Sequence, residues 1–216
     1  MKNSTLIAFL VGILSTGSAS AGPFSIKMLA DNDFAIFSGT STSVDALLYQ
    51  NDVSWTAQVG AVSTLTFNLA SGQDTFYVLG MGGDEPNPGV FGQENISGEV
   101  NGVNMTSVAV SMSSNIVPSL TGYNASDVAD GTYDVILADV QAAFSGLSWG
   151  APVVDSSQTV IVAGGFGSGF IFDRATAHLF SFAAAEVNVP EPSTFLVLAL
   201  GLAGLAFGTR RRKLSA

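Results

Sequence analysis

The segment Phe24-Ser25-Ile26-Lys27-Met28 alternates large apolar residues with a serine and a lysine. Because successive side chains of a β-strand point to opposite faces, this alternation predicts a strand with one buried face. Residues 62–69 repeat the pattern, with Leu65, Phe67 and Leu69 on one face. Further short strand-like segments lie at residues 76–79, 108–112, 159–163, 170–172 and 179–182, separated by Gly, Asn, Asp and Pro. Many short strands joined by turn residues predict an all-β fold, an antiparallel β-sandwich.

One segment has helical rather than strand periodicity. In residues 134–147, the apolar residues Leu137, Val140, Phe144 and Leu147 recur at steps of three and four. This spacing places them on one side of a helix. The sequence therefore predicts a sandwich with a single short helix.

The first 21 residues have the three parts of a secretory signal peptide. Lys2 supplies the positive charge, residues 6–14 are uniformly apolar, and Ala19 and Ala21 form a small-residue cleavage site. We expect signal peptidase to cut before Gly22. The chain contains no cysteine, so a lipoprotein anchor is excluded.

The last 28 residues have three parts in a fixed order. The motif Val189-Pro190-Glu191-Pro192-Ser193-Thr194 comes first, then residues 195–208 without any charge, then Arg210-Arg211-Arg212-Lys213. The prolines disfavour helix up to residue 191, and Ser193 or Thr194 can cap a helix over residues 195–208. Fourteen helical residues rise only ~21 Å, less than the ~30 Å hydrocarbon core. The length alone fits either a buried core helix or a short membrane segment. The basic cluster favours the membrane segment, because it is the cytoplasmic stop expected of a transmembrane helix.

This tail resembles the PEP-CTERM sorting signal of Gram-negative bacteria that produce exopolysaccharide. The resemblance rests on the Pro-Glu-Pro motif, the Gly/Leu/Ala-rich apolar segment and the arginine cluster. It implies recognition by an exosortase, transient insertion in the inner membrane, and release to the cell surface or the extracellular matrix of a biofilm. The signal describes a destination and leaves the activity of the exported part open.

Between the two targeting ends lies one predicted extracellular domain, residues 22–188. It retains 2 basic and 16 acidic residues, which is a formal charge of −14. Such a surface repels phosphate backbones, so nucleic-acid binding is excluded. The absence of cysteine also excludes disulfides, thiol catalysis and cysteine metal sites.

The first half of this domain also resembles the galactose-binding-like jelly rolls of secreted enzymes and lectins. The resemblance covers residues 24–112 and rests on the acidic turn at residues 30–37, Trp55, Gly72, the strand-like residues 75–79 and residues 92–98. It implies a jelly-roll sandwich that either binds sugars or acts as a spacer.

Three adjacent residues are the candidate metal ligands. Asp31, Asn32 and Asp33 offer the hard oxygen atoms that Ca²⁺ prefers, with Asp84 and Glu85 as further donors. The alternative is a solvated turn whose side chains cap a strand. No other cofactor is expected.

Catalytic residues are harder to assemble. His178, the only histidine, lies in a predicted strand, and the sequence contains no G-x-S-x-G motif. Glu85, Glu94 and Glu99 can supply the carboxylate pair of a glycosidase, but so many acidic residues make some close pair inevitable. We therefore expect a protein without enzymatic activity, with a secreted glycan-active enzyme as the alternative.

Aromatic side chains are candidates for stacking on sugar rings. They are Trp55, Trp149, Tyr49, Tyr77 and Tyr123. The alternative for each is packing in the core or at its rim. We select Trp55 and Tyr77 as the predicted carbohydrate-binding residues of a cell-surface or matrix protein associated with exopolysaccharide.

Overall fold

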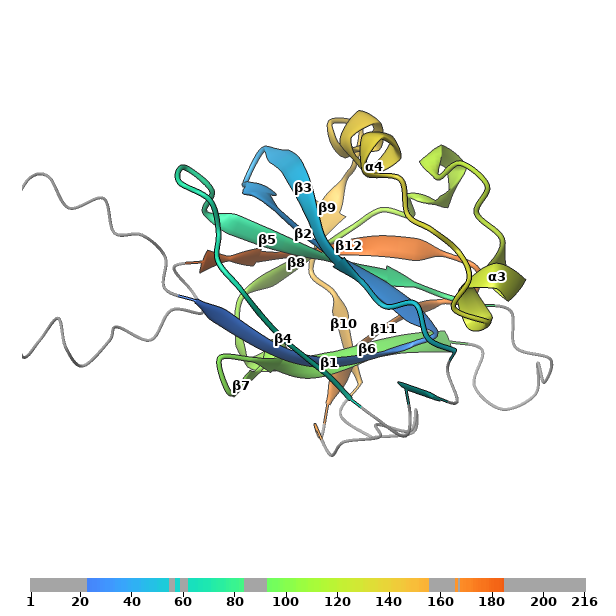
Figure 1. The fold of residues 1–216 in the computed structure, drawn as a ribbon, viewed down its shortest axis with the longest axis horizontal. Coiled ribbons are helices and arrows are strands. Elements are labelled where there is room, and N and C mark those ends of the chain that lie inside the picture. The colour runs from blue at the N-terminus through green and yellow to red at the C-terminus, as the bar shows by residue number, and fades with distance from the viewer. Residues whose placement is uncertain are drawn as a thin grey trace, which may run out of the picture.

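The structure is a computed structural model in which two antiparallel β-sheets pack face to face (Figure 1). The predicted all-β sandwich is therefore confirmed. The structure describes residues 23–54, 57–58, 62–83, 93–155, 166 and 168–184. The predicted strand at residues 159–163 and the two targeting ends lie outside these residues.

The first sheet is built around the segment that opens the domain. Its strand order is β10-β11-β6-β1-β4, with β7 paired to β6. In the pair of β1 with β4, Ile26 lies opposite Leu65, as the alternation of both segments requires. The strands are β1 (Phe24–Asp31), β4 (Ser63–Phe67), β6 (Gln93–Val100), β7 (Val103–Asn104), β10 (Val153–Asp155) and β11 (Gly169–Asp173).

The second sheet has the order β3-β2-β5-β12-β8-β9. Its strands are β2 (Asp33–Thr40), β3 (Ser43–Gln50), β5 (Thr75–Met81), β8 (Val110–Ser113), β9 (Trp149–Gly150) and β12 (Ala177–Ala183). The predicted strands at residues 76–79, 170–172 and 179–182 are confirmed as parts of β5, β11 and β12, and residues 110–112 belong to β8.

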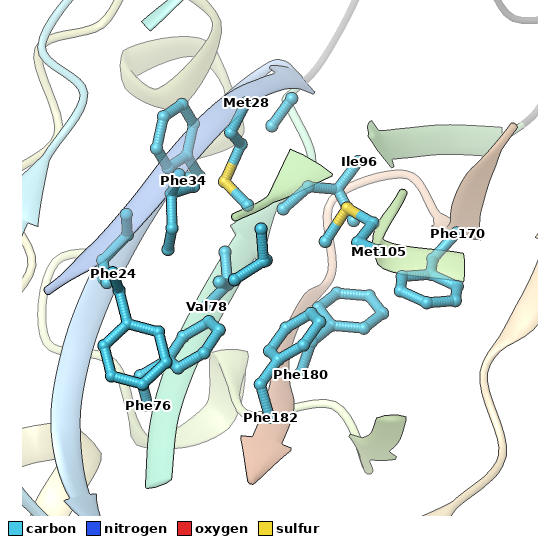
Figure 2. Packing of buried hydrophobic residues seen from close by; sticks show 14 of the residues in the cluster. Phe24, Met28, Phe34, Phe76, Val78, Ile96, Met105, Phe170, Phe180 and Phe182 are labelled. Atoms are coloured by element: carbon cyan, nitrogen blue, oxygen red, sulfur yellow. The ribbon is translucent and has the colours of Figure 1, made fainter. Parts of the chain in front are cut away.

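The main core fills the space between the sheets and is rich in phenylalanine (Figure 2). Phe76 and Phe182 stack with ring centroids 4.8 Å apart, and Phe170 stacks on Phe180 at 5.4 Å. Phe24 packs on Phe76 at 5.5 Å and joins the two sheets at the end where the domain begins. Burial of these large apolar surfaces stabilises a chain that has no disulfide bond.

A second core covers the outer face of the β3-β2-β5-β12-β8-β9 sheet. Residues 116–147 cross this face and contain η2 (Val117–Ser119), α3 (Ala125–Ala129) and α4 (Leu137–Phe144), whereas η1 (Met105–Ser107) follows β7. Strand β5 is therefore buried on both faces, which explains why residues 75–81 are apolar without alternation.

Helix α4 confirms the predicted helix but is shorter than residues 134–147. Ile136, the N-cap residue, has extended geometry (φ −93°, ψ 114°) and makes no capping hydrogen bond from its side chain. Helix α3 was not predicted. Asn124 caps it by accepting a hydrogen bond from Ser126 N at 3.1 Å. Among the described residues, no helix is long and apolar enough to cross a membrane.

Candidate functional site

The turn between β1 and β2 carries the predicted metal ligands, and all three are buried. Asp31 pairs with Asn95, on the side of its sheet opposite to the core residues Ala30 and Ile96. Asp33 shares the outer face of the other sheet with Ala35 and Met81.

The structure therefore does not bring the side chains of Asp31, Asn32 and Asp33 together as one set of ligands. Within the described ranges, no group of three or more acidic or histidine side chains could hold a metal ion. The further donors proposed at Asp84 and Glu85 lie outside the described residues.

Asn32 lies at the centre of a buried polar cluster. Its Nδ2 donates to Glu94 Oε2 at 3.4 Å, and Gln58 Nε2 donates to the Asn32 carbonyl oxygen. Arg174 Nε lies 3.8 Å from Glu94 Oε1. A Cβ atom on Gly83 would lie only 2.6 Å from Asn32 Nδ2, so only glycine lets the backbone pack this closely on the cluster. Gln58 was not selected from the sequence, because no motif marks it.

Asp33, the first residue of β2, adds a buried carboxyl group next to this cluster. Its Oδ1 accepts a hydrogen bond from Phe34 N at 2.7 Å, and its side chain is fully buried. Burial raises the pKa of Asp33 to about 8, although the Phe34 amide and the nearby Asn51 side chain partly oppose this shift. The Tyr123 hydroxyl, which lies at the edge of the cluster, donates a hydrogen bond to the Gly82 carbonyl oxygen at 2.6 Å.

The two residues predicted to stack on sugars have different outcomes. Trp55 lies outside the described residues. Tyr77 is only 1% exposed and donates its hydroxyl to the Thr40 carbonyl oxygen. Phe144 of α4 packs on its ring with centroids 5.3 Å apart. Stacking of a sugar on Tyr77 is incompatible with this burial, because the same ring belongs to the second core.

Trp149 is the aromatic residue that reaches solvent beside Tyr77. Its indole lies 6.1 Å from the Tyr77 ring and 5.7 Å from Phe144, yet 37% of the residue is exposed. Strands β12 and β8 separate β5 from β9, so the two backbones lie ~14 Å apart at ~4.8 Å per strand. The indole must therefore lean back over the sheet, across the short side chains of Ser181 and Ser113.

The catalytic candidates from the sequence occupy separate places. His178 lies in β12, where Nδ1 is 2.8 Å from the Ser113 carbonyl oxygen and Nε2 is 3.1 Å from Thr176 Oγ1. Glu94 and Glu99 lie five residues apart on β6. Their side chains therefore point to opposite faces and start ~16 Å apart, beyond the spacing of a glycosidase pair. Glu85 lies outside the described residues.

The buried Tyr77 hydroxyl gives the domain a testable pH dependence. Burial raises the pKa of Tyr77 to about 12, with smaller contributions from the carboxylates of Asp74 and Asp45. The unfolded chain releases this proton near pH 10, so the stabilisation is intact below pH 10 and lost as the pH rises through 12. In urea unfolding, we expect wild type to lose about 1–2 kcal/mol more than Tyr77→Phe over this range, a value discounted for polar surroundings. Parallel pH profiles for the two proteins would contradict the assignment.

A comparison with known protein families identifies the C-terminal part of the chain. A family model described as the PEP-CTERM protein-sorting motif matches residues 188–213. No curated protein and no solved structure matches the chain. The resemblance of residues 24–112 to galactose-binding-like jelly rolls thus stays a prediction.

The matched motif shows that the chain has the sorting signal of an exosortase substrate. It is a secreted protein that passes through a membrane-anchored stage and is processed before release at the cell surface. The residues that carry this identification, including Pro190, Glu191 and Pro192, lie outside the described part of the structure, as do Ala19, Ala21 and Gly22 at the predicted signal-peptidase cleavage site.

Proposed function

We propose that the exported domain is a non-catalytic component of the cell surface or exopolysaccharide matrix, and that it binds neutral saccharide chains. The observation that carries this proposal is the exposed indole of Trp149, which is held in place by Tyr77 and Phe144. An aromatic ring that is fixed on one side and exposed on the other offers a stacking face for the C–H side of a sugar ring.

The surroundings of Trp149 suit hydroxyl-bearing ligands. Ser111 on the outer face of β8 is exposed, and it pairs with Ser181 of β12. Serine hydroxyls both donate and accept hydrogen bonds, as sugar hydroxyls do. The surface thus combines an apolar stacking face with small polar groups beside it, which is the chemistry of a saccharide site.

The negative charge of the domain determines which class of saccharide it can bind. The carboxylates of Asp45 and Asp74 lie close enough to Tyr77 to raise the pKa of its hydroxyl, and the exported domain carries a formal charge of −14. Anionic polysaccharides are repelled by such a surface. Neutral chains are therefore the proposed ligands, and the polysaccharide of the producing bacterium is the first to test.

A pull-down with immobilised neutral polysaccharide from the producing bacterium tests the proposal. Loss of one central stacking residue costs ~1–3 kcal/mol, so Trp149→Ala is expected to weaken binding about tenfold or more. Trp149→Phe keeps an aromatic face and should retain most of the affinity. Val153→Ala removes a similarly exposed apolar side chain from β10 and serves as the matched control.

Two outcomes would overturn this function. Equal binding by wild type and Trp149→Ala would remove Trp149 from the site. Release of reducing sugar by the wild-type protein would favour the alternative, a secreted glycan-active enzyme.

A further inference from the structure

The turn between β1 and β2 buries more oxygen atoms than its hydrogen bonds satisfy. Four buried side-chain oxygens accept no hydrogen bond from any described residue: Asn32 Oδ1, Asp33 Oδ2, Asn51 Oδ1 and Gln58 Oε1. Folded proteins satisfy nearly all such atoms, because each buried acceptor without a partner costs about 1–3 kcal/mol. Four of them at one turn call for a common partner.

These side chains come from two segments that pack on each other. Asn51 N donates to the Phe34 carbonyl oxygen at 2.9 Å, which places Asn51 beside the start of β2. The Asn51 side chain lies close enough to Asp33 to lower the pKa of its carboxyl. Gln58 Nε2 donates to the carbonyl oxygens of Asn32 and Val53, the latter at 3.2 Å, which aims its amide at the turn.

Within the described ranges, no lysine or arginine forms an ion pair with Asp33. Only two described residues, Lys27 and Arg174, are lysine or arginine. Lys27 Nζ lies 5.5 Å from the centre of the Phe166 ring, and Arg174 lies beside Glu94. The carboxyl of Asp33 is fully buried, and its charged form is costly there without a cation.

The atoms that need a partner define its chemistry. All four are amide or carboxylate oxygens; Asn51 Nδ2, on the same amide as Asn51 Oδ1, is also buried without a partner among the described residues. A water molecule can donate to amide oxygens but cannot balance the charge of a carboxylate. Ca²⁺ does both, since it accepts six to eight oxygen ligands in flexible geometry.

We propose that the β1–β2 turn binds a Ca²⁺ ion, with Asp33 as its charged ligand and the side-chain oxygens of Asn32, Asn51 and Gln58 as neutral ligands. This set differs from the one predicted from sequence, because Asp31 points to the other side of the fold and two distant amides replace it. A site with one carboxylate has moderate affinity, in the range of extracellular Ca²⁺ sites.

Calorimetric titration of the purified exported protein with Ca²⁺, after treatment with EDTA and its removal, tests the proposal directly. We expect saturable binding of one ion, and a rise in Tm of about 1–6 °C in millimolar Ca²⁺. Mg²⁺ should give a smaller rise, because it requires near-ideal octahedral geometry. Absence of both heat and a Tm shift in the wild-type protein would overturn the site and leave only ordered water at the turn.

Substitution of the two amide ligands tests where the ion binds. Asn51→Ala and Gln58→Ala each remove one amide ligand and should abolish most of the Tm rise caused by Ca²⁺. Gln141→Ala is the matched control, because its amide donates to the Val44 carbonyl oxygen at 3.0 Å, away from the turn. Calcium stabilisation that survives in both Asn51→Ala and Gln58→Ala would place the ion elsewhere and contradict the proposed ligands. Neither result depends on saccharide binding at Trp149, so the two proposals can fail separately.

Discussion

Phe180→Ala is expected to lower the free energy of unfolding by about 3–5 kcal/mol. Phe180 is fully buried between the sheets, and its ring stacks on Phe170 and also contacts Phe172 at 6.1 Å (Figure 2). The flanking strands are fixed on both sides of β12 by pairing, so they cannot close the cavity that alanine would leave. Urea unfolding followed by tryptophan fluorescence measures this loss.

Two further variants show whether the loss comes from the core. Phe180→Leu keeps most of the buried volume and should cost less than about 1.5 kcal/mol. Ile136→Ala shortens an exposed side chain and should change stability by no more than about 0.5 kcal/mol. A loss below about 1 kcal/mol for Phe180→Ala would show that the two sheets are not held together by this aromatic layer.

Replacement of Pro190, Glu191 and Pro192 by alanine is expected to abolish release of the protein. These residues form the centre of the matched sorting motif, and alanine removes both the prolines that enforce extended backbone and the carboxylate between them. The altered protein should stay in the membrane fraction with residues 195–216 attached. Mass spectrometry of the wild-type secreted protein should find a start at Gly22 and no Arg210–Lys213 segment.

A substitution just upstream is the control for this experiment. Val187→Ala lies outside the matched residues and should be processed normally. Intact C-terminal residues in the extracellular form of the wild-type protein would contradict processing by an exosortase, whatever the effect of the alanine variant.

The local pattern of the sequence predicts the sandwich where a strand alternates between a more buried and a more exposed face, as β4 and the first half of β1 do. Ile26 and Leu65 alternate with polar neighbours and lie opposite each other in the β1–β4 pair, so the alternation correctly predicts which side chains face the core. Residues 76–79 do not alternate, and the reason lies far away in the chain. The segment 116–147 covers the second face of β5, and no local pattern reveals that contact.

At the candidate sites, too, contacts between distant parts of the chain decide what the local sequence cannot. Tyr77 and Trp149 are both aromatic residues that the sequence offers for stacking on sugars, but tertiary packing buries the first ring and leaves the second partly exposed. Asp31 and Asp33 are two residues apart, and the sequence predicts them as joint ligands. They belong to different strands of different sheets, so their side chains diverge, and Asn51 and Gln58 approach from another part of the chain.

The packing of Phe24 and Phe182 on the same ring, Phe76, has a consequence for the anchored stage of export. It places the beginning of β1 and the end of β12 at one pole of the domain, whereas Asp33 and Ala177, both opposite Met81, mark the other pole. Residues 185–194 connect the end of the domain to the apolar segment, and ten residues reach at most ~36 Å. This tether keeps the pole that holds both ends of the domain within ~36 Å of the membrane segment, whereas the β1–β2 turn lies at the opposite pole. A Ca²⁺ ion bound at that turn, as proposed above, would therefore lie at the end of the domain opposite the tether.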